Sequence, residues 1–144
     1  MDTTPTLRGL AQINLWADDV NAAVKWYTEL LGIEPYFVRP ESGTPEYVEF
    51  RIGDYEHELG IVGRKYAPKE ASKNLGGVVV RWHVDDIAAM LERLKAMGAK
   101  EYEPLTSWGE AGFITASVVD PFGNVLGLIY SPHYVKILGS GKKA

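Results

Sequence analysis

The sequence predicts an α+β fold built of two tandem βαβββ modules, whose curved mixed sheets form a cup. An internal repeat carries this prediction: Asp86 follows Asp19 by 67 positions, and Gly127 follows Gly60 by the same interval. An equal offset at both ends of a unit indicates a duplicated module. We expect one domain made of module one (8–64), a linker (65–75), module two (76–131) and a C-terminal tail (132–144).

Module one begins with an apolar strand that runs into an Asp-Asp pair and an amphipathic helix. Asp18 or Asp19 can cap the helix, and Gly32 provides the left-handed residue that ends it. Two further apolar runs flank a Gly53-Asp54 turn, which predicts a tight hairpin. The expected strands are 10–17, 34–38, 46–52 and 55–62, and the expected helix is 19–31.

Module two repeats this order. Its Asp-Asp pair starts a helix with Ile87, Met90, Leu91, Leu94 and Met97 on one face. The turn residues of "DPFGN" separate its last two strands. The expected strands are 77–84, 100–103, 112–119 and 125–130, the helix is 86–97, and the tail holds a short helical turn.

Composition excludes several classes of partner. A chain of 144 residues with 46% hydrophobic and 24% charged residues is typical of a soluble globular domain. A net charge of −4 disfavours nucleic acid. No apolar run approaches the roughly 20 residues of a membrane-spanning helix, and the N-terminus lacks a signal-peptide core. With no cysteine, disulfides and thiolate sites are excluded. We expect a cytoplasmic protein with a small-molecule ligand.

Strand alternation predicts which side chains face the cup. Val48, Phe50 and Ile52 should pack on the helix, which leaves the residues between them on the concave side, and Trp82 should lie on the helix side. A two-residue turn would pair Arg51 with Glu56. The expected concave charges are costly to bury unless they pair, and Arg51–Glu49 and Arg81–Glu58 are plausible pairs. The ligand-binding candidates are Gln12, Asn14, Trp16, Tyr47, Glu49, Glu58, Gly60, Arg81, His83, Thr115, Ser117 and Gly127.

Trp108 is a further candidate, because it lies in the expected loop "PLTSWGEAGF" between strands. Gly109 and Gly112 on either side would permit movement, so Trp108 could act as a lid over the ligand. Packing within the loop and a subunit contact are equally compatible with an aromatic residue at this position.

The duplicated module, the segment "WHVDDIAAMLERLKAMGAK" and the turn "DPFGNVLGLI" resemble the vicinal oxygen chelate superfamily, over about 10–130. That superfamily includes glyoxalase I, bleomycin resistance proteins and extradiol dioxygenases. The resemblance implies a metal position on the first and last strand of each module, which correspond here to Gln12, Gly60, Val79 and Gly127. These residues lack the donors that a divalent metal requires, so we expect no metal cofactor. A different site could use only His83, Glu58 and Glu49.

The leading functional hypothesis is therefore a metal-free protein that binds a planar, partly polar molecule, like the bleomycin-resistance branch. Glycine at both repeat-related positions would leave room for a ligand where a metal would sit, and Trp16 could stack on its ring. Two alternatives remain: a metal-dependent glyoxalase or dioxygenase, and a metal-free lyase or isomerase with Glu58 as catalytic base. The resemblance and the exposed sheet edges together imply a homodimer.

Overall fold

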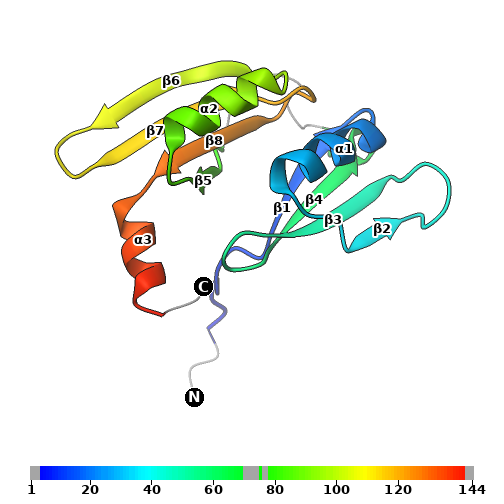
Figure 1. The fold of residues 1–144 in the computed structure, drawn as a ribbon. Coiled ribbons are helices and arrows are strands. Elements are labelled where there is room, and N and C mark those ends of the chain that lie inside the picture. Colours follow the sequence, from blue (N-terminus) through cyan, green and yellow to red (C-terminus); the bar gives the residue numbers. More distant parts are fainter. Residues whose placement is uncertain (1–3, 70–74, 76–77, 142–144) are drawn as a thin grey trace.

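The computed structural model describes residues 4–69, 75 and 78–141. These residues form two four-stranded mixed sheets with three α-helices and one short 3₁₀-helix. Figure 1 shows the two modules side by side, each with its own sheet and helix. Residues 70–74 of the expected linker and residues 76–77 lie outside the described part. No helix in the described ranges is long and apolar enough to cross a membrane.

The sheet of module one has the strand order β1-β4-β3-β2, with β1 parallel to β4 and the other pairs antiparallel. Helix α1 contacts β3 and β4 of this sheet. The elements are β1 (Gln12–Ala17), α1 (Val20–Leu31), β2 (Phe37–Arg39), β3 (Tyr47–Ile52) and β4 (His57–Gly63), followed by the 3₁₀-helix η1 (Arg64–Tyr66).

The sheet of module two has the equivalent order β5-β8-β7-β6, with β5 parallel to β8. Helix α2 covers it, and the expected helical turn of the tail is a helix of eight residues, α3. The elements are β5 (Arg81–His83), α2 (Ile87–Ala96), β6 (Lys100–Trp108), β7 (Phe113–Val119), β8 (Val125–Tyr130) and α3 (Pro132–Gly139).

The 67-residue offset is kept in three dimensions. Asn14 pairs with Gly60 across β1 and β4, and Arg81 pairs with Gly127 across β5 and β8. The helix caps repeat as well: the carboxylate of Asp19 accepts the backbone N–H of Ala22, and Asp86 does the same for Ala89. Duplication therefore reproduces both the strand register and the helix start.

Each module has its own apolar core between helix and sheet. Tyr27 and Phe50 are among the fully buried residues of the first core, and Leu94 of the second. Trp26, Leu30 and Trp82 pack against both cores and so join the modules. The prediction that Trp82 packs in the core is confirmed.

The turn Asp120–Asn124 is the main polar joint between the modules. Asp120 is buried, and its carboxylate accepts the hydroxyl of Tyr27 on α1 at 2.5 Å. The side-chain amide of Asn124 accepts the backbone N–H of Trp16 at 3.2 Å and donates to the Trp16 carbonyl at 2.9 Å. Burial and the charge of Asp120 raise the pKa of Tyr27 well above its ordinary value, so this hydroxyl remains a donor.

The predicted fold needs correction at several points, and one is the expected strand 77–84, among whose described residues only Arg81–His83 form a strand. The β3–β4 hairpin has four loop residues, so Arg51 pairs with Glu58 rather than with Glu56. Strand β6 does not end at Glu103 but continues to Trp108, because Pro104 is tolerated on an edge strand at an irregularity of pairing. The two sheets are separate, and they do not close into a single cup within one chain.

The hairpin correction leaves the faces unchanged. A shift of two residues moves each side chain to the next position on the same side of the sheet, whereas a shift of one would reverse the faces. The alternation argument therefore still applies to β3 and β4. Glu56 takes a left-handed conformation in the longer turn, with φ of 56°.

Candidate functional site

The concave face of sheet one carries a chain of hydrogen bonds that begins at Asn14 and ends at Glu49. Asn14 Nδ2 donates to Gln12 Oε1 at 3.3 Å. Gln12 Nε2 in turn donates to the hydroxyl oxygen of Tyr47 at 2.6 Å and to Glu49 Oε2 at 3.2 Å. Tyr47 also donates to Glu49 Oε2, at 2.5 Å. We call this chain the Gln12 bridge, because it links β1 to β3 across β4.

Gly60 makes the Gln12 bridge possible. It lies on β4 between Asn14 of β1 and Glu49 of β3. A Cβ atom at Gly60 would lie 2.2 Å from Asn14 Oδ1 and 3.3 Å from the Tyr47 hydroxyl. The space above this glycine is therefore filled by the protein's own polar side chains, which corrects the expectation that it is left for a ligand.

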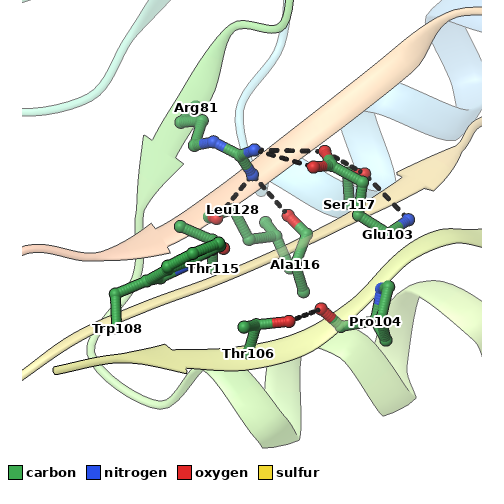
Figure 2. A network of polar contacts seen from close by, with 9 residues as sticks. All are labelled: Arg81, Glu103, Pro104, Thr106, Trp108, Thr115, Ala116, Ser117 and Leu128. Carbon is green, nitrogen blue, oxygen red and sulfur yellow. Dashed lines mark hydrogen bonds and ion pairs between the residues drawn. The ribbon is translucent and has the colours of Figure 1, made fainter.

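The concave face of sheet two carries a second bridge, drawn in Figure 2. The Arg81 guanidinium reaches from β5 across β8 to β7, where Nη1 donates to the backbone carbonyl of Ala116 at 3.0 Å. Its Nη2 lies 3.1 Å from both carboxylate oxygens of Glu103 on β6. Ser117 donates its hydroxyl to Glu103 Oε1 at 2.7 Å and accepts the Glu103 backbone N–H at 3.1 Å. We call this the Arg81 bridge.

Gly127 has the same position in the Arg81 bridge as Gly60 has in the other. It pairs with Arg81 on one side and with Ser117 on the other. A Cβ atom here would lie 2.6 Å from the Val80 carbonyl oxygen, 2.9 Å from Val79 Cγ1 and 3.1 Å from Arg81 Cγ. Glycine is required because neighbouring backbone and side chains already occupy that space.

The Arg81 bridge favours the charged form of its carboxylate. The Ser117 hydroxyl, and after it the charge and hydrogen bonds of Arg81, hold the pKa of Glu103 below its usual value. Sequence analysis missed Glu103, because we expected the strand to end there and considered no side chain of 100–103 as a partner. The longer β6 supplies the missing carboxylate.

Trp108 lies beside the Arg81 bridge at the end of β6. Its indole Nε1 donates to Thr115 Oγ1 at 2.8 Å, and the residue is 59% exposed. Figure 2 shows the ring next to Thr115, on the face that carries Arg81. The expected loop is shorter than predicted, because Trp108 pairs with Phe113 as part of the sheet. The indole is an exposed aromatic surface held in place by a hydrogen bond.

Both predicted ion pairs are wrong. Arg51 Nη1 pairs with Glu58 at 2.9 Å, because these residues lie opposite each other in the corrected hairpin. Arg81 pairs with Glu103 of its own sheet and not with Glu58 of the other. Each arginine thus finds its carboxylate on its own sheet.

One predicted residue, His83, lies away from both bridges. His83 stacks on Tyr134 of α3, with ring centroids 4.7 Å apart, and its Nδ1 accepts the backbone N–H of Ser131. It lines a separate cleft of about 670 Å³ between α2 and α3. Trp16, in contrast, borders a groove of about 560 Å³ that is also lined by Gln12 and Asn14 of the Gln12 bridge and by Val78.

The chain is an α+β protein made of two βαβββ modules. Each module has a helix on one side of its sheet and polar residues on the other. The chain belongs to the Glyoxalase/Bleomycin resistance protein/Dioxygenase superfamily, whose family model matches residues 9–128. A search of the curated proteins gives no match.

Solved structures show the same fold over most of their length. TioX from Micromonospora sp. ML1 is 19% identical, with a TM-score of 0.62 over 85% of this chain and 98% of that one. A glyoxalase-related enzyme from Fulvimarina pelagi is 21% identical, with a TM-score of 0.67 over 88% and 90%. Lactoylglutathione lyase from Agrobacterium tumefaciens is 20% identical, with a TM-score of 0.65 over 90% and 98%. At these identities the likeness establishes the fold alone.

The side chains at the four positions implied for a metal do not make a divalent-metal site. Gln12 is engaged in its bridge, Val79 has no donor atom, and Gly60 and Gly127 have no side chain. Within the described ranges, no group of three or more His, Cys, Asp or Glu residues is placed to hold a metal ion.

Proposed function

We propose that this protein binds a flat, partly polar small molecule on its concave sheet faces, without a metal. The observation that carries the proposal is the pair of polar bridges built over Gly60 and Gly127. Each bridge fixes polar side chains on a sheet surface before any ligand arrives. Fixed polar groups beside aromatic side chains are typical of small-molecule sites.

On sheet two, the ring of a ligand would stack on Trp108, which is exposed and oriented by Thr115. The Arg81–Glu103 pair beside it would contact the polar edge of the ligand. The predicted lid is replaced in this proposal by a fixed stacking surface, because Trp108 belongs to β6.

We extend the proposal to a homodimer with shared sites. The two bridges lie on sheets that do not close around a common space within one chain. A second copy related by two-fold symmetry could place sheet one of one chain against sheet two of the other, and so enclose two identical sites. Light scattering coupled to size-exclusion chromatography would then give twice the mass of the 15.9 kDa chain.

The test uses full-length protein purified without an affinity tag. We expect elemental analysis to find no stoichiometric metal, and a panel of planar aromatic compounds to include some that saturably quench tryptophan fluorescence. A chelator should not change that binding. Stoichiometric zinc, nickel, manganese or iron would support the metal-dependent alternative instead, and no binding across the panel would contradict the proposal.

A pair of variants locates the ligand. Trp108→Ala should weaken binding measured by calorimetry about tenfold or more, since a stacked aromatic contributes about 1 to 3 kcal/mol. Tyr102→Ala is the matched control, because Tyr102 is also an exposed aromatic of β6 and takes no part in the bridge. Equal effects of the two substitutions would contradict the proposal that the ligand stacks on Trp108.

Glu58→Gln addresses the catalytic alternative. Glu58 already accepts a hydrogen bond from Arg51, so a role as base would require this pair to open. If turnover of any bound compound is found, its loss in Glu58→Gln would support the lyase or isomerase hypothesis, and its full retention would exclude Glu58 as the base.

A further inference from the structure

Glu49 is the buried carboxylate of the concave face of sheet one, with 9% of its surface exposed. The hydroxyl of Tyr47 and the amide of Gln12 both donate to its Oε2 atom. Burial raises the pKa of Tyr47 and the charge of Glu58 adds to this, so the tyrosine remains a donor. These donors are neutral, and they orient the Glu49 charge without cancelling it.

The arginines of the two faces are already paired. Each arginine on the concave side has a carboxylate of its own within ion-pair distance. The pairs are Arg39 with Glu41 at 3.2 Å, Arg51 with Glu58 at 2.9 Å and Arg81 with Glu103 at 3.1 Å. Among the residues that the structure describes, no ion pair involves Glu49. One negative charge is therefore left over, and holding it in a partly buried position costs free energy.

Aromatic rings accompany this uncompensated charge. Phe37 on β2 lies directly opposite Glu49 in the sheet, so both side chains are on the same face. The Phe37 and Tyr47 rings are 6.0 Å apart in an edge-to-face arrangement. The guanidinium of Arg39 lies 4.1 Å from the centre of the Phe37 ring, which shows that this ring contacts a cation in the free protein. Sequence analysis gave Phe37 no role.

We propose that the ligand is an aromatic organic cation, such as a protonated amine or a quaternary nitrogen on a flat ring, and that Glu49 holds its positive charge. Oε1 of Glu49 would accept a hydrogen bond or contact the charge, while Phe37 and Tyr47 contribute cation–π attraction. This inference rests on the proposed function and adds to it the charge of the ligand and the residue that selects it.

The test compares two probes of nearly equal shape, the cation 10-methylacridinium and the neutral ketone 10-methylacridone, by calorimetry with the full-length protein. We expect the cation to bind about tenfold or more tightly than the ketone, since an interaction with a charged group contributes more than a neutral one. Glu49→Gln should remove this preference, so that the variant binds the cation and the ketone with affinities within about twofold of each other. Glu41→Gln is the matched control, because Glu41 is exposed and already paired, and it should change neither affinity.

The outcomes separate the two proposals. Equal binding of both probes, ketone binding alone, or an unchanged preference in Glu49→Gln would overturn the inference and leave the proposed function standing. If neither probe binds, the inference is overturned, and the panel of planar compounds decides the proposed function separately. Should Glu49→Gln not fold, a salt series on the unaltered protein decides: affinity for the cation must fall as salt rises while affinity for the ketone does not, and parallel behaviour would overturn the inference.

Discussion

The two sheets solve the same geometric problem with different chemistry. In each, a glycine on the last strand lets a side chain from the first strand cross over it and reach the strands beyond. Over Gly60 lie the neutral side chains of Asn14 and Tyr47, which Gln12 links to Glu49. Beside Gly127 lies the Arg81 side chain, whose guanidinium reaches Glu103. The strand pairing of the duplicated module has been kept, whereas the repeat-related residue opposite the glycine is the neutral Asn14 in one sheet and the cationic Arg81 in the other.

This difference decides where net charge remains. The Arg81 bridge joins a cation to a carboxylate and is balanced by itself. The Gln12 bridge ends on Glu49 and brings no positive charge to it. Repeat-related positions thus give one neutral face and one face with a free negative charge, and only the second is suited to attract a cation.

The largest expected effect is a difference in stability between substitutions at the two glycines. Gly127→Ala should destabilise the fold by about 2 to 3 kcal/mol, because its Cβ would meet the Val80 carbonyl oxygen, which cannot move without displacing β5. Gly60→Ala should cost about 1 kcal/mol or less, because the atom it meets is the end of the Asn14 side chain. Urea unfolding measures both, and equal costs would show that the bridges are not built around the glycines in the way we describe.

Next in size is a change at the joint that both modules share. Tyr27→Phe should cost about 1.5 to 3 kcal/mol, since it removes a buried hydrogen bond to the Asp120 carboxylate. The raised pKa of Tyr27 also gives a pH dependence: its contribution is complete below the ordinary value of 10.0 and falls as the pH rises above it. Denaturant unfolding between pH 8 and 11 should show a smaller alkaline loss for Tyr27→Phe, and an unchanged profile would contradict this.

A smaller effect concerns the contribution of sheet two to stability at acid pH. The lowered pKa of Glu103 stabilises the fold above its ordinary value of 4.5, and this contribution is lost as the pH falls through the folded value. Ser117→Ala should cost about 1 kcal/mol at pH 7 and flatten the acid limb of the stability curve. Ser107→Ala on β6 is a control outside the Arg81 bridge. An acid limb as steep as that of the unaltered protein would contradict the role of Ser117.

The smallest effect concerns the exposed pair on sheet one. A double-mutant cycle with Arg51→Met and Glu58→Gln should give a coupling of about 0.5 kcal/mol or less, because both side chains are partly exposed and screened by solvent. The corresponding cycle for Arg81 and Glu103 should give a larger value, since Arg81 Nη2 contacts both Glu103 carboxylate oxygens at 3.1 Å and the Arg81 side chain is less exposed than that of Arg51. The reverse order would contradict the contrast between the two sheets.

Much of the fold could be predicted, because duplication turns one observation into two. The offset that relates Asp19 to Asp86 also relates the pairing of Gly60 with that of Gly127. Alternation then assigned the faces of β3 and β4 correctly, even though the hairpin register was wrong by two residues. Periodicity is robust to such an error, because a shift of two keeps every side chain on its side.

The partners across the sheets could not be predicted in the same way. Glu103 and Phe37 lie on the edge strands β6 and β2, whose registers depend on loop length and local irregularities. The expected strand 100–103 stops before Pro104, whereas β6 continues past it, and Thr106 donates to the Pro104 carbonyl within the irregular stretch. Those registers decide which charged side chains pair across the sheet, and alternation along a single strand does not predict the registers.

The contact between Asn124 and Trp16 has a consequence for how the protein behaves on storage. The side-chain amide accepts from the backbone N–H of Trp16 and donates to its carbonyl, just as a neighbouring strand would. The N–H and C=O of one residue on the open edge of β1 are thereby shielded from pairing with another molecule. Conversion of Asn124 to aspartate would keep the acceptor and lose the donor, so an ageing sample that has lost this amide should aggregate sooner than a fresh one.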